Sequence, residues 1–141
     1  MRCLITGAGG LLGSAFSALM DHRGVEYKAL AKSDLDVTDQ RATEQCISVE
    51  NPDVVFHCAA FTNVDAAESE RTTSFAVNAD GAQNVAKACK AVGARMVYFS
   101  TDYIFDGTKR STQPWFAPKP QRLVSNIWQR INGWFAHGWL I

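Results

Sequence analysis

Short apolar runs alternate with longer segments of helical periodicity along the first hundred residues of the chain. The apolar runs predict strands over residues 2–6, 27–30, 54–58 and 96–99. Apolar positions spaced three and four apart predict helices over residues 11–23, 38–50 and, in a short and a long piece, 64–92. Strands that alternate with helices imply right-handed crossovers and a parallel sheet covered on both faces. The pattern therefore predicts a doubly wound, Rossmann-like α/β fold.

The predicted helices have recognisable ends and apolar faces. Gly24 should stop the first helix, Thr38 should cap the second, and Asn51-Pro52 should end it. The first helix is expected to place on one face Leu12, Phe16, Leu19 and Met20. The last is expected to carry a single stripe of Phe75, Asn78, Ala82, Val85, Cys89 and Val92.

A glycine-rich segment stands where the first strand turns into the first helix. It reads Thr6-Gly7-Ala8-Gly9-Gly10-Leu11-Leu12-Gly13. Glycine lets the backbone turn tightly and approach a pyrophosphate, and the free amides and positive dipole of a helix start stabilise phosphate charge. Glycine-rich turns also occur for packing alone. The segment by itself therefore has two interpretations, a dinucleotide site and a packing turn.

Further candidate residues follow the third and fourth strands. Ligands of open parallel sheets bind beyond the carboxyl ends of the strands. Those ends are followed here by Ala59-Ala60-Phe61-Thr62 and by Ser100-Thr101-Asp102-Tyr103. Small residues at 59 and 60 leave room for a ribose or nicotinamide, and the hydroxyls at 100 and 101 suit a polarised carbonyl. Thr101 is thus a candidate catalytic residue, with a strand-end turn residue as the alternative.

The composition is that of an ordinary globular protein. The 141 residues are 47% hydrophobic and 20% charged, enough for one domain with a core. The widely spaced Cys3, Cys46, Cys58 and Cys89 form no Cys-x-x-Cys pair, so we expect buried, reduced thiols and no metal. No signal-peptide pattern and no apolar stretch of bilayer-spanning length is present. We expect a cytoplasmic protein that binds neither nucleic acid nor membrane.

The composition changes sharply near residue 108. All 14 acidic residues and 9 of the 14 lysines and arginines precede that point, whereas the remaining 33 residues contain no acid and all 4 tryptophans. We expect a nucleotide-binding domain over 1–108 and an atypical basic tail over 109–141. The tail has the composition of a wrong reading frame or truncated product. Alternatively, its apolar spacing predicts a helix that covers an open sheet edge or lies on a membrane surface.

The ordered motifs together resemble those of one enzyme family. They are Thr6-Gly7-x-x-Gly10-x-x-Gly13, Ala59-Ala60-Phe61-Thr62-Asn63-Val64-Asp65-x-x-Glu68, Asn78 and Ser100-Thr101-Asp102-Tyr103-Ile104-Phe105-Asp106-Gly107. They resemble the extended short-chain dehydrogenase/reductase family, and within it the dTDP-4-dehydrorhamnose reductases. The likeness covers residues 1 to about 108. It implies an oxidoreductase of dTDP-L-rhamnose synthesis that uses NADPH or NADH on a sugar nucleotide, dTDP-4-dehydro-L-rhamnose.

The resemblance also implies roles for individual residues. The loop from Gly7 to Gly13 would hold the cofactor, with Gly10, Leu11 and Leu12 at its pyrophosphate. Asp36 and Val37 would lie against the adenine. The ribose and nicotinamide path would be lined by Ala59, Ala60 and Phe61. Thr101 would be the hydroxyl member of the catalytic set, and Asp102 beside it would face the sugar nucleotide.

Several of these residues have a simpler structural interpretation. Asp36 is equally suited to cap a backbone amide in a turn. Asn78 interrupts an apolar stripe, so we expect it to bond buried backbone near the site. His57 lies in an apolar strand and is expected to be a core residue. No acid ends the second strand to accept from the 2′-hydroxyl of NAD, and Lys32 there either favours the 2′-phosphate of NADPH or is a solvated surface lysine.

One family feature is absent from these 141 residues. Reductases of this kind use a Tyr-x-x-x-Lys pair, and the residues four beyond Tyr27, Tyr98 and Tyr103 are Ala31, Asp102 and Gly107. We therefore expect a C-terminally incomplete fold and an inactive or weakly active fragment. The alternative is a non-catalytic NADP-binding subunit similar to the regulatory beta subunit of methionine adenosyltransferase. An exposed parallel edge would favour a homo-oligomer.

Overall fold

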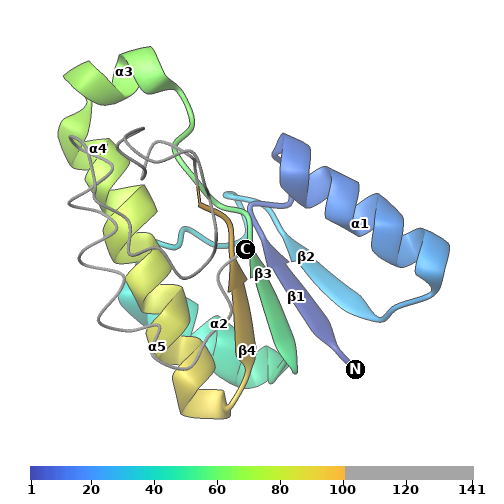
Figure 1. The fold of residues 1–141 in the computed structure, drawn as a ribbon. Helices are drawn as coiled ribbons and strands as arrows, with labels where there is room; N and C mark the ends of the chain where they lie inside the picture. The colour runs from blue at the N-terminus through green and yellow to red at the C-terminus, as the bar shows by residue number, and fades with distance from the viewer. Residues whose placement is uncertain (101–141) are drawn as a thin grey trace, which may run out of the picture.

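Residues 1–100 form a parallel sheet with helices on both faces; they are the residues that the structure, a computed structural model, describes (Figure 1). The elements in chain order are β1 (Cys3–Thr6), α1 (Leu11–Arg23), β2 (Tyr27–Leu30), α2 (Gln40–Glu50), β3 (Val54–His57), α3 (Val64–Ser69), α4 (Arg71–Phe75), the π-helical segment η1 (Ala76–Gly81), α5 (Ala82–Val92) and β4 (Arg95–Tyr98). The predicted alternation of strands and helices is confirmed.

The sheet has the strand order β2-β1-β3-β4, and all neighbouring strands are parallel. The last residue of β1, Thr6, pairs with Leu30 of β2 and His57 of β3, and His57 pairs with Tyr98 of β4. The carboxyl ends of the four strands therefore form one level edge. β2 lies on one side of β1, and β3 and β4 lie on the other. The strand order therefore reverses at β1, and doubly wound sheets bind their ligands at such a reversal.

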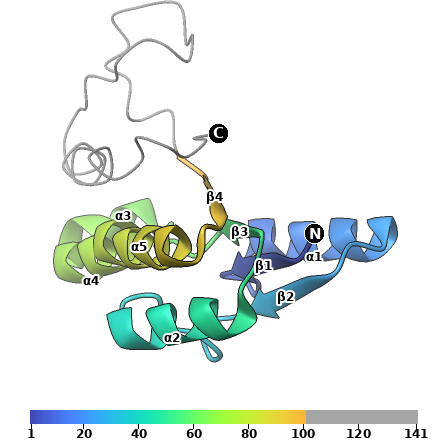
Figure 2. The ribbon, with the colours of Figure 1, turned by 90° about the horizontal axis from the view of Figure 1, so that it is seen from below.

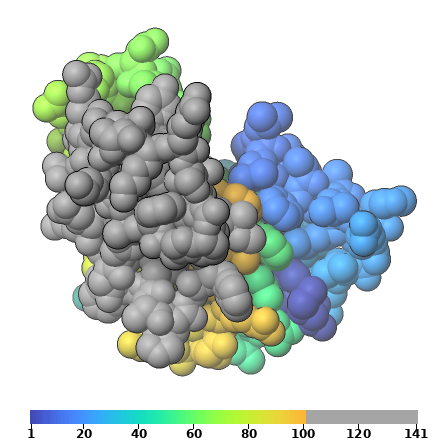
Figure 3. Space-filling model, in the orientation of Figure 1, coloured from blue at the N-terminus to red at the C-terminus, as the bar shows by residue number. Residues whose placement is uncertain are grey.

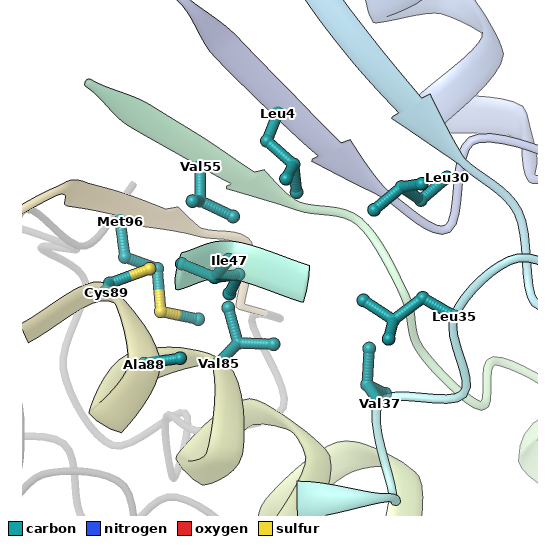
Figure 4. Close-up of a cluster of buried hydrophobic side chains, with 10 residues drawn as sticks. All are labelled: Leu4, Leu30, Leu35, Val37, Ile47, Val55, Val85, Ala88, Cys89 and Met96. Atoms are coloured by element: carbon teal, nitrogen blue, oxygen red, sulfur yellow. The ribbon is translucent and has the colours of Figure 1, made fainter. Parts of the chain in front are cut away.

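The two faces of the sheet are covered by different helices. Figure 2 shows α1 on one side of the sheet and α2 and α5 on the other. On the α1 side, Cys3 and Ile5 of β1 pack with Met20. Leu4, which lies between Cys3 and Ile5 in β1, points to the other side and packs in a larger core. The buried residues of this core, shown in Figure 4, are Leu4, Leu30, Leu35, Val37, Ile47, Val55, Val85, Ala88, Cys89 and Met96. Burial on both faces explains why β1 is apolar without alternation, because each of its four residues is buried.

The helix ends agree with the sequence at most positions. Gly24 and Asn51 end α1 and α2 in the left-handed conformation, with φ of 61° and 41°. The predicted cap at Thr38 is wrong. Asp39 caps α2 instead, since its side chain accepts a hydrogen bond from the Ala42 amide, while the Thr38 hydroxyl donates to Asp36. Threonine and aspartate are both good N-cap residues. The path of the loop places Asp39, and not Thr38, at the N-cap of α2.

The predicted face of α1 is only partly buried. Met20 is buried, and the Phe16 ring lies 4.8 Å from that of Phe56 on the sheet. Leu12 and Leu19, the other two residues of this face, are 41% and 47% exposed. The helix turns only a narrow stripe toward the short strands beneath it.

The long predicted helix is interrupted by a π-helical segment. Glu70 separates α3 from α4, and α4, η1 and α5 then follow one another without a break from Arg71 to Val92. The periodic stripe gave no sign of the wider turn at Ala76–Gly81. Such turns are common at functional sites because they re-aim one side chain. Asn78 lies within this turn.

The cysteines are free thiols, as expected. Cys3 and Cys89 are buried, and Cys46 and Cys58 are half-buried. Burial raises the pKa of Cys58 to about 11 and that of Cys89 to about 12, which keeps both protonated and unreactive near neutral pH. Within residues 1–100, each helix is too short or too polar to span a bilayer.

Candidate functional site

The glycine-rich loop lies at the level edge of the sheet, between the ends of β2 and β3. The Ala8 amide donates to the Leu30 carbonyl at 3.0 Å, and the Cys58 amide donates to the Thr6 carbonyl at 3.1 Å. Gly7 takes a φ of 68°, a conformation that side-chain-bearing residues rarely adopt. The first predicted site segment is thus at the strand-order reversal.

The three spaced glycines differ in what surrounds them. A Cβ on Gly7 would lie 2.5 Å from the Ala59 amide nitrogen, and one on Gly13 would lie 2.4 Å from the Gly7 carbonyl oxygen. Both positions are closed to side chains by packing. A Cβ on Gly10 would meet only the Gly7 carbonyl oxygen, at 3.4 Å, and the backbone there has an ordinary φ of −85°. Gly10 therefore leaves open space that neither the turn nor the packing of the described residues requires.

That space adjoins free amides at the start of α1. Gly10 is the N-cap of α1 and makes no side-chain cap, and the first intrahelical acceptor is its carbonyl, which bonds Ser14. Within residues 1–100, no acceptor serves the amides of Leu11, Leu12 and Gly13. Such amides and the helix dipole attract an anion. The open cradle and the unpaired donors together fit a phosphate group.

The first turn of α1 is also unusually apolar and exposed. Leu11 is 92% exposed, at the end of the helix nearest the carboxyl edge of the sheet. The space-filling view shows α1, in blue, forming one flank of the molecule, away from the green residues of α3 (Figure 3). Exposed leucines beside an anion cradle suit a ligand with both charged and apolar parts.

The loop after β3 forms the second wall. Ala59 lies directly against Gly7, Ala60 is exposed and Phe61 is half-buried. Asn78 holds Phe61 on both sides: its Oδ1 accepts from the Phe61 amide at 2.7 Å, and its Nδ2 donates to the Phe61 carbonyl at 3.0 Å. The prediction that Asn78 bonds backbone near the site is confirmed.

The loop after β2 is held by the same long helix. Asn84 Nδ2 donates to the Val37 carbonyl at 3.0 Å, and the Val37 side chain packs where a Cβ on Gly81 would lie, 2.7 Å away. Asn84 was missed by sequence reasoning, although it interrupts the helix as a polar residue in the way that Asn78 does. Both loops are thus attached to one helix through asparagines six positions apart.

Asp36 and Val37 lie in this second loop. The Thr38 amide and hydroxyl donate to the exposed Asp36 carboxylate and lower its pKa, with a smaller contribution from the charge of Lys32. Asp36 therefore does act as a turn carboxylate. The Val37 side chain is buried in the core, so only its backbone is placed to meet a ligand.

His57 lies below the edge of the sheet and is 2% exposed. Its Nδ1 is 2.8 Å from the Thr6 hydroxyl, and its ring stacks on Tyr98 with centroids 5.8 Å apart. Burial lowers the pKa of His57 to about 4, so the ring is neutral at physiological pH. Among residues 1–100, Nε2 has no hydrogen-bond partner, which the core-residue interpretation did not anticipate.

The remaining predicted residues lie outside the described part of the chain. These are Thr101 and Asp102, together with Tyr103 and the whole 109–141 tail. Over residues 1–100, no three His, Cys, Asp or Glu side chains gather as metal ligands would. The described site therefore consists of the glycine loop, the start of α1 and the two loops tied to the long helix.

Comparison with known protein families adds an independent observation. Residues 1–123 match the RmlD substrate binding domain family. The chain belongs to this family. Members of known name have similar sequences: dTDP-4-dehydrorhamnose reductase of Mycobacterium tuberculosis is 48% identical over 113 residues, and that of Streptomyces griseus is 46% identical over 107 residues.

Solved structures of the RmlD type share the fold. The dTDP-4-dehydrorhamnose reductase of Bacillus anthracis, crystallised in complex with NADP, is 34% identical with a TM-score of 0.85 over 94% of this chain and 48% of that one. The Clostridium acetobutylicum protein is 33% identical with a TM-score of 0.86 over 95% of this chain and 48% of that one. The match to the Mycobacterium tuberculosis enzyme covers 80% of this chain and 36% of that enzyme. The chain thus spans only part of its relatives.

Proposed function

We propose that the described residues bind the pyrophosphate of NADPH or NADH on the glycine loop. The observation that carries the proposal is the open space at Gly10 beside the unpaired amides of Leu11, Leu12 and Gly13. Gly7 and Gly13 bring β3 and α1 close enough to build that cradle. A dinucleotide-binding turn requires three such roles. Gly7 makes the tight turn, Gly10 leaves the approach to the pyrophosphate open, and Gly13 allows close packing of the helix.

The two flanking loops take the rest of the dinucleotide. Asp36 and the Val37 backbone lie at the adenine, and Ala59, Ala60 and Phe61 line the ribose and nicotinamide. The hydrogen bonds of Asn78 to Phe61 support this assignment, because they hold the wall in one conformation before the ligand arrives.

The whole protein is a reductase of a 4-keto sugar nucleotide, dTDP-4-dehydro-L-rhamnose, as the names of its relatives suggest. The bound coenzyme supplies a hydride to the carbonyl carbon. Thr101 hydrogen-bonds the carbonyl oxygen and Asp102 faces the sugar nucleotide. Residues 1–108 are the nucleotide-binding unit, and 109–141 are a separate tail of different composition.

The 141-residue chain alone should bind coenzyme without appreciable turnover. It contains no Tyr-x-x-x-Lys pair, and the loss of a positioned general acid costs about 10² to 10⁴ in rate. Turnover of dTDP-4-dehydro-L-rhamnose by this chain at the rate of a full-length relative would contradict this expectation.

A chimera tests the reductase proposal directly. Residues 1–108 of this chain replace the matching segment of the Mycobacterium tuberculosis enzyme, and NADPH oxidation is followed with dTDP-4-dehydro-L-rhamnose. We expect activity from the chimera and none from a control chimera carrying Gly10→Asp, whose carboxylate repels the pyrophosphate. A folded chimera that binds NADPH without turnover would instead favour a regulatory nucleotide-binding role.

A further inference from the structure

A polar pair is buried directly beneath the proposed coenzyme site. Thr6 and His57 are the last residues of β1 and β3, and they face each other in register. They are 1% and 2% exposed, and the Thr6 hydroxyl lies 2.8 Å from His57 Nδ1. Two residues earlier in the same strands, Leu4 and Val55 lie in the apolar core. Because side chains two apart lie on one face of a sheet, the pair occupies positions suited to apolar residues.

The hydrogen bonding of this pair is incomplete. In a neutral imidazole one nitrogen carries the proton and the other accepts, so the Thr6 hydroxyl can bond Nδ1 in either tautomer. Nε2 is left over in both cases, and within residues 1–100 it has no hydrogen-bond partner. The ring also stacks on Tyr98, with centroids 5.8 Å apart. A buried polar atom without a partner lowers stability, which an apolar pair of the same shape would not do.

Pairing of the two strands does not require this side-chain hydrogen bond. The backbone ladder joins β1 to β3 along the whole of β1, and the Cys58 amide also donates to the Thr6 carbonyl at 3.1 Å. The site depends more closely on this level of the sheet. Gly7 follows Thr6 directly, and a Cβ on Gly7 would lie 2.5 Å from the amide nitrogen of Ala59, two residues after His57. The pair therefore lies where the glycine loop and the loop after β3 begin.

We propose that Thr6 and His57 are positioning residues for the coenzyme: their hydrogen bond holds the glycine loop and the loop after β3 at the separation that the dinucleotide spans, and it does so at the expense of stability. The inference rests on the proposed coenzyme site and adds the contact that presets it. A hydrogen bond is short and directional, whereas apolar contact is not, so it fixes the two loops more closely than an apolar pair would. Loops already held in their bound arrangement lose less entropy on binding, which raises affinity.

Replacement of both partners separates position from stability. Thr6→Val and His57→Leu together remove the hydrogen bond and also the unpaired Nε2. At pH 7.5 we expect this double variant to unfold at the same temperature as the unmodified chain or a higher one, yet to bind NADPH about tenfold more weakly in fluorescence titration. Each single variant leaves one buried polar group without its partner, so it should unfold at a lower temperature than the double variant.

Two further variants test whether the hydrogen bond is the cause. His57→Gln keeps a group that can bond the Thr6 hydroxyl, so it should retain most of the affinity, and adding Thr6→Val to it should remove this rescue. The matched control is Leu4→Val with Val55→Leu, which exchanges the sizes of a buried, in-register pair two residues below in the same strands. Its affinity for NADPH should equal that of the unmodified chain.

The outcomes distinguish this inference from the proposed function. A double variant of Thr6 and His57 that binds NADPH normally, or that unfolds at a lower temperature than the unmodified chain, would overturn the positioning role and leave the coenzyme site standing. An equal loss of affinity in His57→Gln or in the control of Leu4 and Val55 would do the same. Failure of the folded, unmodified chain to bind NADPH would overturn both. Circular dichroism checks the folding of each variant.

Discussion

At the scale of single residues, glycines of one motif serve different purposes. Gly7 and Gly13 are required by the fold, because any side chain would overlap neighbouring backbone. Gly10 is required by neither backbone conformation nor packing within the described residues. A residue that the fold does not need, placed beside free amides, is best explained by a ligand.

This difference predicts opposite effects of substitution. Gly7→Ala and Gly13→Ala should each lower the free energy of unfolding by more than about 2 kcal/mol, through the positive φ or the overlap. Gly10→Ser should leave stability unchanged or raise it, because serine is a good N-cap, yet it should weaken NADPH binding about tenfold by filling the cradle and occupying an amide. Thermal unfolding and coenzyme titration measure the two properties. A Gly10→Ser variant that binds NADPH normally would remove the main support for the coenzyme site.

His57 links the first and third strands directly beneath the edge of the site. Its neutral ring bonds Thr6 and stacks on Tyr98, and its pKa of about 4 lies below the ordinary value of 6.5. At a pH between these values the unfolded chain binds a proton that the folded chain excludes. Stability from this residue is therefore full above about pH 6.5 and declines as the pH falls toward 4.

The magnitude is set by the shift, about 3 kcal/mol for a change of this size. Urea unfolding at pH 7.5 and pH 5 should show a loss of stability in the unmodified chain that is smaller in His57→Gln, which cannot titrate. His22→Gln is the control, because His22 is exposed at the end of α1. If the pH dependence of His57→Gln equals that of the unmodified chain, His57 is not the titrating group.

At the scale of elements, one long helix supports both loops of the proposed site. Asn78 in η1 bonds the backbone of Phe61, and Asn84 in α5 bonds that of Val37. The π-helical turn lies between α4 and α5, where it sets the direction of Asn78 relative to the residues of α5. Helical periodicity predicts that a helix is present here but does not predict this widened turn.

Removal of Asn78 should loosen the loop after β3. Asn78→Ala leaves the half-buried Phe61 amide without its acceptor, which should cost about 1–3 kcal/mol and weaken coenzyme binding. Hydrogen exchange of the Phe61 amide should quicken. Asn63→Ala is a matched control in the same loop, because the Asn63 side chain caps α3 by accepting from the Ala66 amide and, within residues 1–100, makes no hydrogen bond to Phe61. Unchanged exchange at Phe61 in Asn78→Ala would show that the loop is held by other contacts.

At the scale of the whole molecule, the site arises because the strands end level and the order reverses at β1. The turn after β2, the glycine loop and the loop after β3 meet there although they are far apart in the sequence. Family membership agrees with this arrangement. The match to the Mycobacterium tuberculosis reductase covers 36% of that enzyme, so these residues correspond to only part of its length.

Local patterns were enough to predict the parallel fold, most helix ends and the position of the glycine loop. Apolar periodicity, glycine spacing and proline act within a few residues, so they can be recognised without knowing the tertiary contacts. The choice of Asp39 over Thr38 as a cap, the role of Asn84 and the half-satisfied state of His57 could not be predicted in this way. Each depends on the position of backbone from another segment.

The glycine loop shows the division most clearly. Its glycine spacing predicted a turn that either binds a phosphate or packs closely against the sheet. The sequence could not distinguish these two roles, because both require small residues. Only the folded chain, which brings Ala59 against Gly7 and leaves Gly10 clear, distinguishes a glycine needed for packing from one that leaves room for a ligand. The free space around each glycine depends on segments about fifty residues away in the sequence, such as Ala59 for Gly7. The local sequence pattern therefore cannot reveal it.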